Sequence, residues 1–578
     1  MKQETIAIIG FGPRGLSALE SIFLEAAKTN TLIKILIFEK SGQLGSSWVY
    51  GPDQSKSNWL NIAERAVAIW PRRSIVFDDF QIPSFPDFQE WIEYDTDKDD
   101  SSLDRFPLRS QMGGYLNERY SGMAKTLLSK GLLEVVQGEV VQVAPKNGAV
   151  AICLNDGTTF TTTEAVLTIG HQPTEVDGQL KAWQSYAAQN RHVKLFRDTY
   201  PVENILRSGT IKPERNIGIR GFGLAMIDVV RALSQKLGGR FKVIDESTRA
   251  MKYLPSGKEA DVLVPFSLDG LPMAPKPLNK KIDQNYVPTD SQLEKFRKAV
   301  RKSIESDIEL KSPEFLMDAI APLIVEKFSS SRLISRPHNL KNNEIRSLVK
   351  SWLLDENFSH PLIVSKKLPV NEMIAFFVGM ATGTKAVSLD FCIGHIWRHC
   401  QPTMYELLSF APLSDELIAA IVALDERLKR YSYGPPVDSL QQLLALVAAK
   451  RLTLDYIRDP DIETTESGWR LTNKNSSIKV QVMVNSVLDS PELKKVASPI
   501  VRRLLEDDKV EALHDDLGIR TEENGSVKFA NSEKSYRLSV LGRLAKGTLI
   551  GVDAIAECFG ERSELWAQGV LSRLREKQ

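Results

Sequence analysis

Two glycine-rich turns hold the residues whose types and spacing could do chemistry. The first runs Gly10-Phe11-Gly12-Pro13-Arg14-Gly15, and the second runs Gly221-Phe222-Gly223. In the first turn, Gly10 allows a tight exit from a strand, Gly12 lets a pyrophosphate approach the backbone, and Gly15 lets the next helix pack closely. Two such turns in one chain predict two sites for phosphate-bearing nucleotides.

The residues around the first turn predict a strand, a helix and a second strand that ends in an acid. Thr5 to Ile9 is short and rich in isoleucine, as buried parallel strands are. The helix, from about Pro13 to Ala27, has a proline in its first turn, where a missing N–H costs nothing. Glu39 follows the second apolar strand, and its carboxylate could accept hydrogen bonds from a ribose hydroxyl. This order predicts a dinucleotide site with the helix N-terminus facing the phosphates.

The second turn is less complete than the first. It precedes a predicted helix over 224–237, but Met226 occupies the position of the third glycine. A later apolar strand ends at Ser267, where contacts to an adenosine ribose are expected, and Leu268 follows it instead of an arginine for a 2′-phosphate. Three other cations are candidates for that role and equally for surface charges: Arg249, Lys252 and Lys258.

Further positions are candidates for contact with a cofactor. Trp48 closes a loop of small residues and could pack near a cofactor ring or anchor the loop as a buried tryptophan. Asn61 lies in an apolar run, where its amide needs a partner such as a cofactor edge or backbone groups. A strand over 165–168 runs into Gly170 and His171, and we interpret His171 as a loop histidine rather than a catalytic acid.

Length and composition restrict the class of protein. The chain has 578 residues, which predicts two to four domains, and its net charge of +1 gives no electrostatic signature for nucleic acid or acidic membranes. The longest apolar stretches are shorter than a bilayer span. Four cysteines without a CxxC pair predict a reduced, cytoplasmic protein, and a core strand at the N-terminus predicts no cleaved leader.

The region from about 282 to 455 has the periodicity of helices and contains a Cys/His cluster. Cys392, His395, His399 and Cys400 fall together, and three of them share one face of a helix. Such side chains could bind zinc, but the spacing matches no structural zinc motif closely. The flanking apolar residues favour core packing, so we predict no metal.

The remaining segments indicate one particular layout. Residues 138–163 predict a three-stranded meander, and the strand over 536–541 ends at Gly542, followed by a predicted helix over 552–559. A βαβ start, a meander and a strand that ends in glycine are the layout of FAD-binding domains of the disulfide-reductase type. The C-terminal segment either completes that domain or forms a small independent one.

Several segments resemble a bacterial FAD/NAD(P)-binding family that includes FAD-dependent urate hydroxylase and aspartate N-monooxygenase. The segments are Gly10-Phe11-Gly12-Pro13-Arg14-Gly15-Leu16, Arg220-Gly221-Phe222-Gly223-Leu224, Tyr253-Leu254-Pro255-Ser256-Gly257-Lys258-Glu259, Tyr433-Gly434-Pro435-Pro436 and Leu541-Gly542-Arg543. The resemblance covers most of the chain and is specific for the family rather than for one substrate. Because the family pattern has an arginine after the serine equivalent to Ser267, Leu268 leaves the choice between NADPH and NADH open.

Together these features predict an α/β fold with two Rossmann-like dinucleotide-binding domains, a discontinuous FAD domain and a large helical insertion. The predicted domains are 1–205 (FAD-binding, first part), 206–280 (NAD(P)-binding), 281–475 (helical insertion or cap) and 476–578 (FAD-binding, closing part). The predicted cofactor-binding residues are Gly10, Gly12, Pro13, Arg14, Gly15, Glu39, Trp48, Asn61, Gly170, Gly221, Gly223, Ser267 and Gly542. No catalytic residue is predicted.

The resemblance implies an FAD-dependent oxidoreductase that uses NADPH or NADH. The activity it implies is a monooxygenase that hydroxylates a small polar nitrogen-containing metabolite through a C4a-peroxyflavin. A flavin oxidoreductase without oxygen transfer, or a flavin-binding scaffold with a degenerate NAD(P) site, are the alternatives. The expected partners are a small-molecule substrate and O2, with no nucleic acid and no membrane, and a homo-oligomer is left open.

Overall fold

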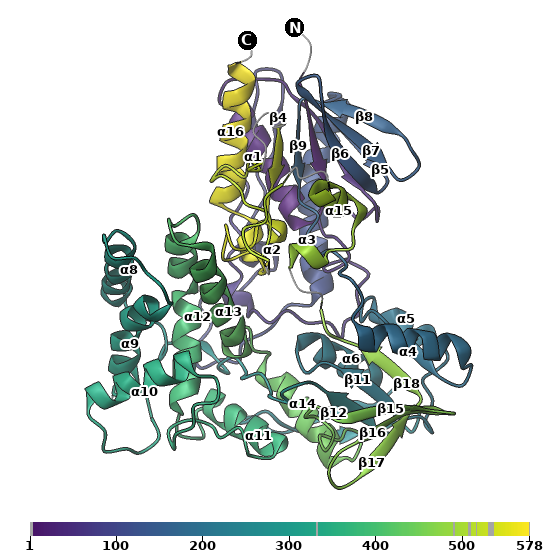
Figure 1. The fold of residues 1–578 in the computed structure, drawn as a ribbon, viewed down its shortest axis with the longest axis vertical. Helices are drawn as coiled ribbons and strands as arrows, with labels where there is room; N and C mark the ends of the chain where they lie inside the picture. Colours follow the sequence, from purple (N-terminus) through teal and green to yellow (C-terminus); the bar gives the residue numbers. More distant parts are fainter. Residues whose placement is uncertain are drawn as a thin grey trace.

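The structure is a computed structural model that describes residues 4–330, 333–488, 492–506, 510–515, 517–529 and 537–576. Figure 1 shows a parallel sheet with its helices in the upper part, and a second sheet beside a helical region in the lower part. The two chain ends lie close together at the top of the view.

The first sheet is parallel and is assembled from distant parts of the chain. Its five strands, in spatial order, are β19 (Leu538–Val540), β9 (Glu164–Leu167), β1 (Thr5–Ile9), β2 (Lys34–Glu39) and β5 (Leu133–Gln137). β19 pairs with β9, so Leu538 lies opposite Ala165. The first domain is therefore discontinuous, as predicted. Residue 536, in the predicted closing strand, lies outside the described residues.

Helices and smaller sheets cover both faces of the first sheet. On one face are α1 (Pro13–Ala27), α3 (Arg109–Ser129) and α16 (Glu561–Arg575), whose apolar residues share one core. The hydroxyl of Ser17 donates to that of Ser563 over 2.9 Å and so joins α1 to α16. The other face packs against α15 (Pro499–Glu506) and the meander β6 (Val140–Lys146), β7 (Ala149–Leu154) and β8 (Thr159–Thr162).

The second sheet is also parallel and carries the second glycine turn. Its order is β10 (Lys194–Phe196), β18 (Val482–Asn485), β11 (Ile217–Arg220) and β14 (Leu263–Phe266). Three helices belong to the same unit: α4 (Gly178–Gln189), α5 (Val202–Arg207) and α6 (Leu224–Gln235). The unit also contains a hairpin, β12 (Arg240–Asp245) and β13 (Ala250–Leu254), and a meander, β15 (Asp461–Thr465), β16 (Gly468–Thr472) and β17 (Ser477–Val480). β10 and β18 are thus part of the second sheet, although both lie in ranges that were predicted to belong to the FAD domain. The boundaries at 205 and 476 stay predictions.

Between β14 and β18, two strands of the second sheet, the described residues form the eight helices of the helical region. They are α7 (Lys280–Asp283), α8 (Asp290–Ile304), α9 (Glu314–Phe328), α10 (Asn342–Leu354), α11 (Val370–Ala381), α12 (Leu389–Leu408), α13 (Asp415–Ser432) and α14 (Val437–Ala448). Ile219 and Met226 of the second sheet unit belong to the same hydrophobic core as Phe377 and Trp397 of this region. The insertion therefore has no core of its own and is continuous with the second dinucleotide-type unit.

The helix predicted over 552–559 is wrong. This stretch contains only a single 3-10 turn, Ala556–Cys558, and α16 begins later at Glu561. The polar side chain of Asp553 is bound to cations of neighbouring segments, and Gly560 has a φ of +142°. Gly542 is followed by another 3-10 turn, Arg543–Ala545, rather than by an α-helix.

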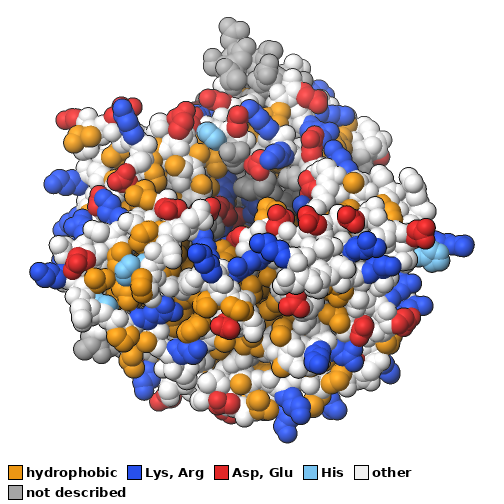
Figure 2. All heavy atoms as spheres, turned by 60° about the horizontal axis from the view of Figure 1, so that its bottom comes forward, with side chains coloured by type: hydrophobic (Ala, Val, Ile, Leu, Met, Phe, Trp, Pro, Cys, Tyr) orange, Lys and Arg blue, Asp and Glu red, His pale blue; other side chains and the backbone are white. Residues whose placement is uncertain are grey.

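Two surface properties bear on partners. No helix in the described part of the chain is long and apolar enough to cross a membrane. On the face in Figure 2, basic and acidic side chains are interspersed over the surface.

Candidate functional site

The first glycine turn joins β1 to α1 at the carboxyl edge of the first sheet. Gly10 has a φ of +82°, and its N–H donates to the carbonyl of Phe38 over 2.8 Å. A Cβ at Gly15 would come within 2.7 Å of the carbonyl oxygen of Gly10, so only glycine permits this helix-to-strand distance. A Cβ at Gly10 would come within 2.9 Å of the Ile169 Cα. The end of β9, leading to Gly170, therefore lies against the turn, as the predicted site requires.

Glu39 holds the position expected of a ribose ligand. It ends β2, the neighbour of β1, and is buried. Its Oε2 accepts a hydrogen bond from the N–H of Phe11 over 2.8 Å, and its Oε1 accepts from the N–H and hydroxyl of Ser41 over 2.8 and 2.7 Å. Each carboxylate oxygen can accept two hydrogen bonds, so Oε2 keeps a lone pair for a ligand hydroxyl.

Arg14 and Ser46 supply buried donors beside the turn. Within the described chain, Arg14 Nη2 and the Ser46 hydroxyl are buried and have no hydrogen-bond partner. Buried polar groups normally have partners, and an anion at the N-terminus of α1 would satisfy both the guanidinium and the dipole of the helix. Gly12 faces the Ser47 side chain, which a Cβ would approach to 3.2 Å. These donors and the missing Cβ atoms fit a bound pyrophosphate.

Gly542 brings the C-terminal segment to the same place. It has a φ of +94°, and a Cβ there would lie 2.8 Å from Arg14 Nε. Pro13 is the first residue of α1 and so opens the helix as predicted. The structure therefore brings together eight predicted positions around α1: Gly10, Gly12, Pro13, Arg14, Gly15, Glu39, Gly170 and Gly542.

Trp48 and Asn61 lie at contacts with other parts of the chain. Trp48 is 44% exposed, so it is not a buried loop anchor, and its ring centroid lies 6.1 Å from that of Tyr200. The Asn61 Nδ2 donates to the backbone carbonyl of Tyr433 over 2.9 Å. A cofactor edge and a backbone group were the two partners expected for the Asn61 amide, and the structure has the backbone group. The second N–H of this amide remains available to a ligand.

The second turn has a similar course at the edge of the second sheet. Gly221 has a φ of +118°, and a Cβ there would lie 2.7 Å from the Ser486 hydroxyl. Gly223 is the N-cap of α6, and a Cβ at Gly223 would have nothing within 4 Å. Met226 is fully buried in the core that α6 shares with the helical region. The third-glycine position thus packs a large apolar side chain.

The ribose end of this second site differs from the first. Ser267 follows β14, and its N–H donates to the carbonyl of Ile457 while its hydroxyl accepts from the N–H of Gly270. Leu268 is 85% exposed, so this position offers solvent a leucine side chain. Arg249, one of the alternative cations, is bound to Asp438.

A buried charge network that sequence reasoning missed connects the two sheets. Asp228 of α6 accepts from the hydroxyl of Tyr200 over 2.7 Å and pairs with Arg109 at 3.4 Å and Arg231 at 3.3 Å. Arg231 also donates to the carbonyl of Ser57 over 2.7 Å, in the loop of the first unit. Burial raises the pKa of Asp228, although both arginines oppose this, and burial lowers that of Arg231 to about 10.

A second buried charge cluster surrounds His171. Asp553 binds Lys429 at 2.5 Å, Lys546 at 2.8 Å and Arg543 at 2.5 Å, so three cations share one carboxylate. Burial favours protonation of Asp553, but these cations hold its pKa well below the usual range. Burial, and next the charge of Arg543, lowers the pKa of His171 to about 4.

The Cys/His cluster is packed in the helical core. Cys392, His395 and Cys400 are fully buried, and His399 lies 3.2 Å from a carboxylate oxygen of Asp283. Over the residues that the structure describes, no group of three or more His, Cys, Asp or Glu side chains could hold a metal.

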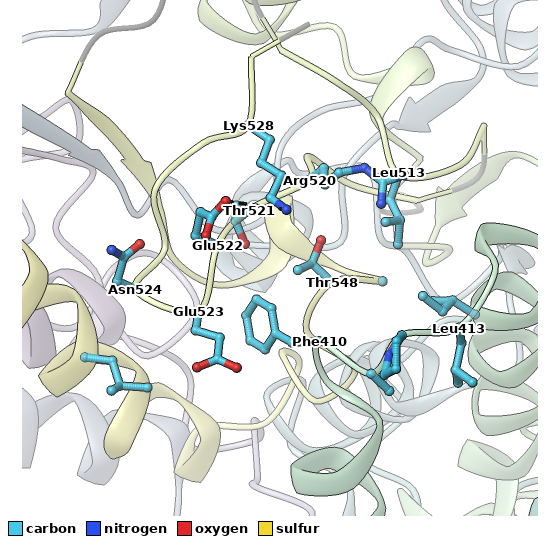
Figure 3. Close-up of a pocket in the computed structure, with 15 residues that line it drawn as sticks. Phe410, Leu413, Leu513, Arg520, Thr521, Glu522, Glu523, Asn524, Lys528 and Thr548 are labelled. Atoms are coloured by element: carbon cyan, nitrogen blue, oxygen red, sulfur yellow. Dashed lines mark ion pairs between the residues drawn. The ribbon is translucent and has the colours of Figure 1, made fainter. Parts of the chain in front are cut away.

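One cavity in the described part of the chain is lined by residues of neither glycine turn. Figure 3 shows its lining residues, which come from the α12–α13 connection and from the C-terminal segment. Its volume is ≈ 640 Å³, and Phe410, Arg520 and Thr548 are among its lining residues. None of the predicted cofactor-binding residues lines it.

Comparison with known proteins agrees with the first site. Residues 7–172, which carry the first glycine turn, Glu39 and Gly170, match the FAD-NAD(P)-binding family. This segment is therefore similar to that family. The resemblance inferred from the sequence is thereby confirmed, and FAD with a nicotinamide nucleotide are the cofactors of such a domain.

Individual relatives resemble more of the chain. Nitrosuccinic acid synthase npaA of Aspergillus oryzae is 25% identical over 554 residues, which are 86% of this chain and 81% of that protein. An L-aspartate N-monooxygenase (nitrosuccinate-forming) of Streptomyces davaonensis is 25% identical over 285 residues, 45% of this chain and 42% of that protein. Ornithine hydroxylase (PvdA) from Pseudomonas aeruginosa, in its reduced form, superposes with a TM-score of 0.45 at 12% identity and covers 99% of this chain and 100% of that one.

Proposed function

We propose that this chain is an FAD-dependent, NAD(P)H-using monooxygenase that hydroxylates the nitrogen of a small amine-bearing metabolite. The observation that carries the proposal is the pair of glycine turns on two parallel sheets, of which the first belongs to an FAD-NAD(P)-binding domain. A relative named nitrosuccinic acid synthase, similar over 86% of this chain, supports the choice of nitrogen as the oxidised atom.

The residues of the first site would hold FAD. The Gly10–Gly15 turn, Arg14 Nη2 and the Ser46 hydroxyl would bind the pyrophosphate, and Glu39 would accept from the adenosine ribose. When bound, FAD would carry two electrons from NAD(P)H to O2, so that one oxygen atom goes to the substrate nitrogen and the other leaves as water.

The remaining residues would orient the two nucleotides and exclude water. The turn at Gly221 and Gly223 would bind the nicotinamide nucleotide. The Asp228 network ties α6 to the loop of the first unit through Ser57, and this fixes the two sheets relative to each other. We place the substrate where this loop meets the helical region, at the contact of Asn61 with Tyr433.

A flavin oxidoreductase without oxygen transfer is the second candidate. It would use both glycine turns in the same way and would differ only in where the electrons of the reduced flavin go. The exposed Leu268 instead favours the third alternative, a flavin-binding scaffold with a degenerate NAD(P) site, because it gives the nucleotide no charged contact at the ribose end of the second site.

The test is a stepwise spectroscopic experiment on the purified full-length protein. The proposal expects a bound flavin spectrum, bleaching by NADPH or NADH without oxygen and, in air with L-aspartate as the first amine tried, a product that carries an added oxygen on nitrogen. A flavoprotein that is reduced but yields only hydrogen peroxide with every amine supplied would favour the second candidate. Failure to bind flavin would overturn both.

A further inference from the structure

Lys276 lies on a segment fixed between the second sheet and the helical region. The N–H of Lys276 donates to the carbonyl of Pro435 over 2.9 Å, and that of Ala274 donates to the carbonyl of Arg430 over 2.9 Å. A Cβ at Gly434 would come within 1.7 Å of the Ala274 carbonyl oxygen, so this close approach requires glycine. The backbone that carries Lys276 is therefore held firmly against the turn that follows α13.

The side chains of Lys276 and Asn61 meet on that turn from two different parts of the fold. The Lys276 ammonium donates to the carbonyl of Ser432, and the Asn61 amide donates to the next carbonyl, that of Tyr433. Two N–H groups of the ammonium and one of the amide remain for other acceptors. An ammonium and an amide thus lie side by side where the loop of the first unit reaches the helical region.

The surrounding charges do not balance. Asp283 pairs with Arg65 at 3.0 Å and also with Arg398, and Asp104 pairs with Arg65 at 2.8 Å. In the described parts of the chain, no carboxylate lies within 4.0 Å of the Lys276 ammonium, which is half-buried. Arg65 and Arg398 thus pair with these two carboxylates, and Lys276 pairs with neither.

Arg398 adds positive charge near Lys276. Its Nε is buried and has no hydrogen-bond partner among the described residues. Burial, and next the charge of Arg398, holds the pKa of Lys276 well below its usual value. Because a partly buried cation without a counter-charge is costly, Lys276 would gain from an anion at this place.

We propose that Lys276, with the Asn61 amide beside it, binds a carboxylate group of the substrate. The substrate is then an amino acid rather than a simple amine, and the carboxylate fixes which end of the molecule faces the flavin. This inference rests on the proposed N-hydroxylation. By contrast, the cations Lys429, Lys546 and Arg543 already share the carboxylate of Asp553.

The experiment measures the binding of small carboxylates to the oxidised holoenzyme. L-Aspartate and succinate are titrated while the flavin difference spectrum and tryptophan fluorescence are recorded, without NAD(P)H and so without turnover. Lys276→Met should bind both probes roughly 10- to 100-fold more weakly than the wild type, because a charge-assisted hydrogen bond is lost. Lys276→Arg should retain part of the affinity. Lys281→Met, the same change at an exposed lysine nearby, should bind as the wild type does.

The outcomes separate this inference from the proposed function. Unchanged affinity in Lys276→Met, or a wild type that binds neither probe, would overturn the carboxylate site. Weaker binding of NADP+ with unchanged binding of succinate would show instead that Lys276 contacts the nucleotide, and this too would overturn the inference. A wild type that binds L-aspartate through Lys276 but never oxygenates it would leave the carboxylate site standing and refute the N-hydroxylation.

Discussion

Gly542 lies directly against Arg14, although the two residues come from opposite ends of the chain. A Cβ at Gly542 would come within 2.8 Å of Arg14 Nε, and Gly542 itself has a φ of +94° and a ψ of −143°. The C-terminal segment thus sets the position of a guanidinium that stands beside the first glycine turn, so the proposed FAD site depends on both ends of the sequence.

Gly542→Ala should therefore weaken FAD binding as well as stability. The backbone conformation is essentially restricted to glycine and would cost alanine about 1–3 kcal/mol, and the new Cβ would also displace Arg14. The measurements are the flavin-to-protein ratio after purification and the unfolding temperature. Gly131→Ala is the matched control, because Gly131 also has a positive φ of +67° but nothing within 4 Å of its Cβ position. Equal flavin content in both variants would show that the contact with Arg14 is irrelevant to the cofactor.

Arg14→Met should lose FAD without a large loss of stability. Arg14 Nη2 is buried and has no hydrogen-bond partner in the described chain, so its removal breaks no hydrogen bond of that atom within the protein. Against a phosphate, loss of the charge should weaken FAD binding roughly 10- to 100-fold, measured by titrating the apoprotein with FAD. Arg14→Lys should fall between, and Arg191→Met, an exposed arginine, should behave as the wild type. Wild-type affinity in Arg14→Met would place the pyrophosphate elsewhere.

His171 should make the protein less stable in mild acid. Its pKa is lowered to about 4 in the folded state by burial and by Arg543, whereas an unfolded histidine titrates near 6.5. Below pH 6.5 the unfolded chain therefore binds a proton that the folded protein does not, and the free energy of unfolding falls until about pH 4. Urea unfolding between pH 7.5 and 4.5 measures this slope, and His171→Gln should flatten it. An identical slope in the variant would assign the acid sensitivity to other groups.

The local parts of the fold could be predicted from the sequence. The strand, turn and helix from Thr5 to Ala27 have the predicted bounds, because apolar periodicity, the glycines and Pro13 act over a few residues. The helical periodicity from about 282 to 455 also corresponds to the structure, since α8 to α14 all lie within that range. The candidate FAD site followed for the same reason, since most of its residues lie within one βαβ unit.

What could not be predicted depends on pairing between distant segments. The residues over 478–484 have the alternation of a strand. However, the local sequence does not indicate that 482–485 pairs with β11 while 477–480 pairs with β16 in a different sheet. The pairing of Asp228 with Arg109 is equally non-local, because it requires α6 to face the first residue of α3 in the first unit. Similarly, the apolar residues over 552–559 suggest a helix, but the cations around Asp553 and the backbone at Gly560 hold the segment in an irregular form.

Leu268→Arg should shift the choice of reductant toward NADPH. Leu268 directly follows Ser267 after the second sheet's edge strand and is 85% exposed, so an arginine there can reach a 2′-phosphate and should change stability by less than about 0.5 kcal/mol. The dissociation constant of NADPH should fall, and that of NADH should rise or stay the same. Anaerobic titration measures both constants, and the rates of flavin reduction provide a second measure. A gain of roughly tenfold for NADPH is expected from one new charge-assisted hydrogen bond. Ile308→Arg adds the same charge at a comparably exposed apolar residue and controls for long-range attraction of the nucleotide. If both variants favour NADPH equally, the effect comes from net charge, and the nucleotide ribose does not lie at the end of β14.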